Sequence, residues 1–102
     1  MRRPLQTRRE PRVREHYGRL RSCYEALLKT NNEARGKVQT RFTIAPDGLV
    51  TTRCIDRETT VDDQGLAECV LAEFSAMKFA SNEDDYVYTT VVYPIVFSPA
   101  PR

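Results

Sequence analysis

The chain of 102 residues has few of the side chains on which metal binding and acid–base catalysis depend. It has no tryptophan and a single histidine, His16, so a histidine-based metal site or catalytic pair lacks the residues it needs. No apolar run approaches the ~18 residues of a membrane-spanning helix, and no signal peptide is visible at Met1. We therefore predict a protein that is not an enzyme and that uses no metal and no cofactor.

What the chain does have is an ordinary globular composition with an uneven distribution of charge. Hydrophobic residues make up 40% and charged residues 29% of it, which predicts one folded domain rather than disorder. Residues 1–22 hold eight arginines and two glutamates, whereas residues 23–102 hold eight basic and twelve acidic residues. We interpret 1–12 as a basic arm or linker end and 13–98 as the domain. This argues against a nucleic-acid-binding core and leaves the arm as the polyanion candidate.

Two stretches have the period of amphipathic helices. One follows Pro11 and ends near Gly36, and the other follows Asp62 or Asp63, either of which can cap a helix. Their apolar positions recur at steps of three and four: Val13, Tyr17, Leu20, Tyr24, Leu27 and Leu28 in the first, and Leu66, Cys69, Val70, Phe74 and Met77 in the second.

Three stretches alternate with the period of two that is typical of strands. Residues 38–44 and 49–55 flank Pro46-Asp47-Gly48, which predicts a hairpin because proline presets φ, aspartate bonds its own backbone and glycine accepts positive φ. The third strand, 86–97, follows an acidic turn at 81–85.

The order α-β-β-α-β predicts an α+β fold, with a three-stranded antiparallel sheet and two helices packed on one face. A right-handed crossover over the second helix places the last strand beside the first, at an edge of the sheet. Pro94 fits an edge because proline has no backbone donor.

One face of the last strand carries Tyr86, Tyr88, Thr90 and Val92, residues more β-prone than a merely solvated face needs. Its backbone from Tyr86 to Val92 is a candidate for pairing with an extended segment of a partner. An edge guarded by Pro94 and by the acidic turn is an equally good interpretation.

Cys23 and Cys69 both lie on apolar helix faces, so their sulfur atoms meet if the helices pack side by side. A bridge between them and two small buried hydrophobic side chains are alternatives that spacing alone leaves open.

An ordered set of short motifs resembles the TonB C-terminal-like domain, most of all its myxobacterial AgmX/PglI type. The matching residues, spread over 13–97, are Cys23-Tyr24-Glu25, Gly36-Lys37-Val38, Phe42-Thr43-Ile44, Asp47-Gly48-Leu49-Val50, Cys69-Val70, Phe79 and Tyr93-Pro94-Ile95-Val96-Phe97.

The resemblance implies a non-catalytic periplasmic domain at the end of a longer protein that an absent segment anchors in the inner membrane. Such proteins link a proton-driven inner-membrane motor to the outer envelope, in transport or gliding motility, and grip a peptide segment of an outer-membrane or periplasmic partner by adding it as a strand. Carried over, that role falls on Tyr86, Val87, Tyr88, Thr89, Thr90, Val91 and Val92. The resemblance also favours a disulfide between Cys23 and Cys69, which an oxidising compartment suits.

Two features depart from the family pattern. Ala80 stands where relatives tend to have proline, and Cys54 is an additional cysteine that we expect to be buried in the second strand. Two alternative functions follow from other features of the chain. One is a structural domain that dimerises edge to edge through its last strand, and the other is a polyanion binder that uses Arg2, Arg3, Arg8, Arg9, Arg12 and Arg14.

Overall fold

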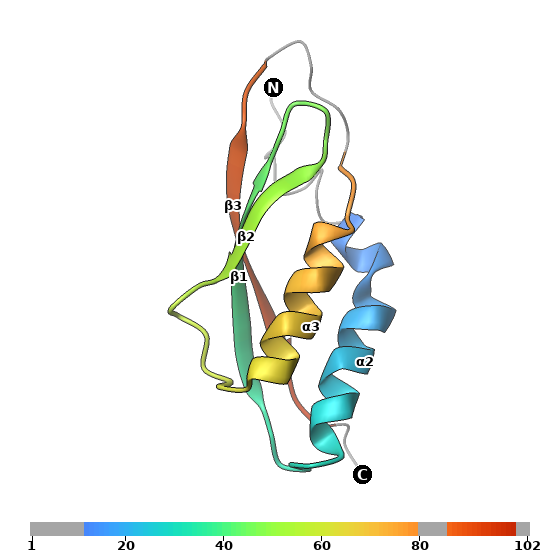
Figure 1. Cartoon of the computed structure of the whole chain (residues 1–102). Helices are drawn as coiled ribbons and strands as arrows, with labels where there is room; N and C mark the ends of the chain where they lie inside the picture. The colour runs from blue at the N-terminus through green and yellow to red at the C-terminus, as the bar shows by residue number, and fades with distance from the viewer. Residues whose placement is uncertain (1–11, 80–85, 100–102) are drawn as a thin grey trace, which may run out of the picture.

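The computed structural model describes residues 12–79 and 86–99. Its elements are α2 (Tyr17–Leu28), β1 (Gly36–Ile44), β2 (Val50–Ile55), α3 (Gln64–Ser75) and β3 (Thr89–Phe97). The strands form one antiparallel sheet in the order β2-β1-β3, and both helices cover the same face of it (Figure 1). This confirms the predicted α+β fold and the place of the last strand beside the first. The predicted acidic turn and nearly all of the basic arm lie outside the described residues.

The first helix begins in two steps. Residues 12–15 are helical, and a turn at His16 separates them from α2. The His16 ring nitrogen Nδ1 lies 2.6 Å from Glu73 Oε1, so this turn is tied to α3. Val13, Leu20 and Tyr24 from the predicted stripe are buried, because these positions face the sheet and the second helix. Helix α2 is therefore fixed along its length by packing rather than by its own caps.

The hairpin and the second helix have the local chemistry that their sequences predict. Gly48 has a φ of 91°, and the Asp47 carboxylate accepts a hydrogen bond from the Leu49 N–H at 3.0 Å. Asp63, rather than Asp62, caps α3: its Oδ1 accepts from the Leu66 N–H at 2.8 Å. Both elements thus begin or turn at residues that satisfy exposed backbone donors.

The core lies between the sheet and the two helices. Phe42 of β1 packs between Phe74 of α3 and Phe79, with ring centroids 5.1 and 5.8 Å away. Tyr24 of α2 stacks on Phe97 of β3 at 4.8 Å. These aromatic contacts join all the layers, since they link strands and helices that are far apart in the sequence.

A disulfide joins Cys23 of α2 to Cys69 of α3, 46 residues apart in the sequence. The predicted burial of Cys54 is wrong: its side chain is exposed. Cys54 lies opposite Arg41 in the β1–β2 register, and directly opposite residues of antiparallel strands share a face. That face is the one without helices, so the thiol is in contact with solvent.

The last strand begins at Thr89, not at Tyr86 as predicted. Strand β1 ends at Ile44, which pairs with Thr89, and the chain then turns at residues 46–47. Tyr88 therefore has no β1 residue to pair with. Tyr86 has a φ of 51°, which takes the backbone out of the extended conformation. Within the described residues, no helix has the length and apolar character needed to cross a bilayer.

Candidate functional site

The outer edge of β3 is the candidate site, because no strand of the described chain pairs with it. The sheet has a second outer edge, on β2, but that strand has six residues against nine in β3 and follows an irregularity in the register next to Ile44. It also carries the exposed charge of Arg53 in its middle. Short, irregular and charged edges resist pairing with further strands, so the β3 edge is the one better suited to it.

The register determines which backbone groups of β3 face outward. Within a strand, the N–H and C=O of one residue point to the same side, and those of the next residue point to the other. The carbonyls of Lys37 and Gln39 accept from the N–H groups of Thr60 and Asp56, on the β2 side of β1. Even-numbered residues of β1 therefore face β3, and they lie opposite odd-numbered residues of β3.

It follows that Thr90, Val92, Pro94 and Val96 direct their backbone groups away from the sheet. Thr90, Val92 and Val96 each present an N–H and a carbonyl, whereas Pro94 presents only a carbonyl. Because the missing donor of Pro94 lies on the outer side, this proline removes no hydrogen bond between β1 and β3. The edge is thus a row of hydrogen-bonding groups with one missing donor.

The predicted peptide-binding residues divide into three groups. Tyr86, Val87 and Tyr88 precede β3 and are 81%, 51% and 64% exposed. Thr89 and Val91 direct their backbone toward β1, and the Val91 side chain belongs to the core. Thr90 and Val92 lie on the outer edge with exposed side chains. The structure adds Val96, which is 75% exposed and which the sequence prediction did not include.

A groove runs between α2 and the C-terminal half of β3. Its volume is about 290 Å³, and it is lined by Tyr17, Leu20, Arg21, Tyr24 and residues 94–98. Aromatic side chains set its width: the Tyr17 and Tyr93 hydroxyls are 3.1 Å apart, and Tyr24 stacks on Phe97. The sequence did not predict the groove, because its two walls, on α2 and on β3, are about 70 residues apart in the chain. The one signal was the place of Tyr17, an aromatic residue with a polar hydroxyl, in the apolar stripe of the first predicted helix.

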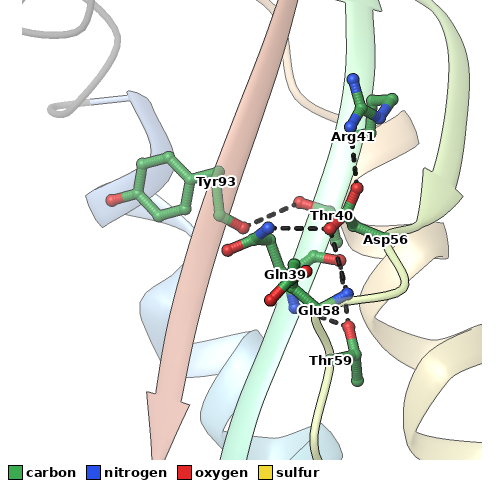
Figure 2. A network of polar contacts seen from close by, with 7 residues as sticks. All are labelled: Gln39, Thr40, Arg41, Asp56, Glu58, Thr59 and Tyr93. Carbon is green, nitrogen blue, oxygen red and sulfur yellow. Dashed lines mark hydrogen bonds and ion pairs between the residues drawn. The ribbon is translucent and has the colours of Figure 1, made fainter.

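A polar network on β1 holds the segment after β2 in place (Figure 2). The Asp56 carboxylate is almost fully buried and accepts hydrogen bonds from Glu58 N–H at 3.1 Å, Arg41 at 2.8 Å and Gln39 at 2.8 Å. These bonds, with that of the Glu58 N–H contributing most, hold the pKa of Asp56 below its usual range. The Thr59 hydroxyl accepts from the Gln39 N–H at 2.9 Å. The network therefore closes the β2 side of β1, and its groups satisfy one another.

The part of the chain that the structure describes contains no group of three or more His, Cys, Asp or Glu side chains placed to hold a metal ion. The candidate site consists of the outward-facing backbone groups of β3 and the groove beside them. Chemically, this arrangement can accept a further strand: backbone groups on the edge pair with it, and the groove receives alternate side chains.

Comparison with known proteins agrees with the fold. No protein-family model matches the chain, and no curated protein matches it. The solution structure of the Helicobacter pylori TonB C-terminal domain is similar, with a TM-score of 0.52 and 18% identity, over 86% of this chain and 84% of that one. At this identity the likeness shows a shared fold. It gives no support for the AgmX/PglI subtype.

Proposed function

We propose that this chain is a non-catalytic protein-interaction domain that takes up an extended peptide of a partner protein along the outer edge of β3. The observation that carries the proposal is the row of outward-facing backbone groups at Thr90, Val92, Pro94 and Val96, with which no described strand pairs. Strand addition uses such a row directly, because main-chain hydrogen bonds supply affinity and alternate side chains supply specificity.

The likeness of fold to the Helicobacter pylori TonB C-terminal domain supports a TonB-like setting. We propose a periplasmic domain of a TonB-like transducer of energy or force, in transport or in gliding motility of the AgmX/PglI kind. In that setting the partner is a peptide segment of an outer-membrane or periplasmic protein, and a proton-driven inner-membrane motor acts through the rest of the full-length protein. The disulfide between the two helices supports an oxidising compartment.

The strength of such a grip follows from the few bonds that the edge offers. Each backbone hydrogen bond contributes about 1 kcal/mol net, and association costs at least ~4 kcal/mol of lost freedom. We therefore expect weak, reversible binding. Several bonds loaded together share a pulling force, which suits a contact that must be made and released in cycles.

The test is an NMR titration of the ¹⁵N-labelled chain with peptides from the periplasm-facing segments of outer-membrane proteins. We expect shift changes along the β3 edge, and weaker binding by Val92→Pro, which removes one outward donor without touching the β1 ladder. Arg53→Pro is the matched control, because it removes an outward donor from β2. Equal binding by wild type and Val92→Pro would contradict the proposal, as would shifts confined to the arginine-rich segment.

The same edge also suits a second function, an antiparallel homodimer through β3. The exposed Cys54 lies on β2, at the other edge of the sheet, so it cannot crosslink a dimer formed through β3. Sedimentation velocity at two concentrations, with and without reductant, distinguishes the two: a dimer sediments faster at the higher concentration, whereas a peptide-binding monomer does not. The polyanion alternative predicts salt-sensitive DNA binding that disappears when residues 1–12 are removed.

A further inference from the structure

The groove beside β3 contains one formal charge that has no partner. Among the side chains that line it, Arg21 of α2 is the one charged residue, and the others are apolar, aromatic or hydroxyl-bearing. Arg21 lies between Tyr17 and Tyr24 on the same side of α2, one turn from each. A guanidinium group therefore borders an otherwise largely apolar channel.

Arg21 is one of several arginines of the described ranges without an ion pair, with Arg14, Arg35, Arg53 and Arg57, but none of those four lines the groove. Arg12, Arg19 and Arg41 each have a carboxylate oxygen within 4 Å. Arg21 forms no ion pair and no side-chain hydrogen bond with any residue in the described ranges, although Glu25 lies one turn further along the same helix. The structure thus leaves five N–H donors of a fixed planar group available beside the groove.

The geometry of strand addition relates this charge to the bound peptide. A strand added to β3 places every second side chain on the helix-covered side of the sheet, where the groove lies. The groove extends along residues 94–98. At about 3.3 Å per residue, side chains on one face of a peptide recur every ~6.6 Å, so about two neighbouring ones fit along this stretch.

We infer that the partner peptide carries an aromatic or aliphatic side chain and, two residues away on the same face, an Asp or Glu whose carboxylate pairs with Arg21. This inference rests on the proposed function and adds the chemical class of the peptide to it. Arg21 is a specificity residue, because the backbone of β3 alone would bind peptide strands of different sequence with equal affinity. Arginine suits the role because its fork matches a carboxylate in two parallel hydrogen bonds.

The test uses three synthetic fluorescein-labelled peptides, Thr-Val-Thr-Phe-Thr-X-Thr-Val with Glu, Gln or Lys at X, and the same three in reversed order, because either strand direction fits the edge. Binding is measured by fluorescence anisotropy to wild type, Arg21→Glu, Arg53→Glu and Val92→Pro. Arg53→Glu is the matched control: it makes the same charge change on the other edge of the sheet. Both arginines are exposed, so both variants keep the fold, which circular dichroism checks.

In at least one of the two peptide directions, we expect wild type to bind the Glu peptide roughly 5-fold more tightly than the Gln peptide. The Lys peptide should bind most weakly. Arg21→Glu should reverse this order, and Arg53→Glu should preserve it. If wild type and Arg21→Glu rank the peptides alike while Val92→Pro weakens all of them, the inference is wrong and the strand-addition proposal stands. If wild type binds none of the peptides, or if Val92→Pro binds as wild type does, both are wrong.

Discussion

Removal of the disulfide between Cys23 and Cys69 should cost this domain a large part of its stability. The bridge spans 46 residues of sequence, which include the whole hairpin and the start of α3. In the chain-entropy relation, a closed loop of that length constrains the unfolded state by about 4 kcal/mol. The total stability of a small domain is about 5–15 kcal/mol, so we expect the reduced protein to be only marginally folded.

The assay is thermal unfolding followed by circular dichroism, with and without a reductant, on wild type and on two variants. Each kcal/mol lowers the Tm of a domain of this size by roughly 4–8 °C, so reduction of wild type should lower its Tm by about 16–32 °C. The Cys23→Ala/Cys69→Ala variant should have this lower Tm both with and without reductant. Cys54→Ala is the control and should respond to reductant as wild type does. A fall of less than about 5 °C in reduced wild type would refute the reasoning.

Two further predictions concern the Asp56 network and the glycines. Because the folded pKa of Asp56 is lowered, its contribution to stability is complete above the ordinary carboxyl pKa of about 3.9 and is lost as the pH falls below it. In urea unfolding from pH 7 to pH 2.5, the stability of Asp56→Asn should therefore converge on that of wild type in acid; a difference that stays constant with pH contradicts this. Gly36→Ala should destabilise by about 1–3 kcal/mol, since φ is +141° and its Cβ would lie 2.6 Å from Thr60 Oγ1, while Gly18→Ala, with open space around it, should stabilise by up to ~1 kcal/mol. Equal signs for the two glycine variants would contradict the second prediction.

The sequence was informative wherever the structure is decided by neighbouring residues. Pro46, Asp47 and Gly48 form the turn by their own backbone preferences, and Asp63 caps α3 from three residues away. The helix stripes fixed one buried side for each helix, which was enough to predict that both helices cover one face of the sheet. The edge position of the last strand followed from the handedness of the crossover.

What the sequence could not supply depends on pairings between distant segments. The start of β3 is set by the residue at which β1 ends, and Tyr86–Val87–Tyr88 has strong β propensity but no partner beyond Ile44. The exposure of Cys54 is set by the register with Arg41. The sequence of β2 gives little signal, because its apolar residues Val50 and Ile55 stand at its two ends and residues 51–53 between them are polar. The groove depends on how closely α2 approaches β3, which the Tyr17–Tyr93 and Tyr24–Phe97 contacts determine.

Amide hydrogen exchange at single-residue resolution tests the central claim most directly. In the free protein, the amides of Val91 and Ile95, which face β1, should exchange slowly, and those of Thr90, Val92 and Val96, which face outward, should exchange fast. A saturating amount of the peptide found in the NMR titration should slow the outward amides by about tenfold or more. Binding that leaves Thr90, Val92 and Val96 as fast as before would contradict docking on this edge.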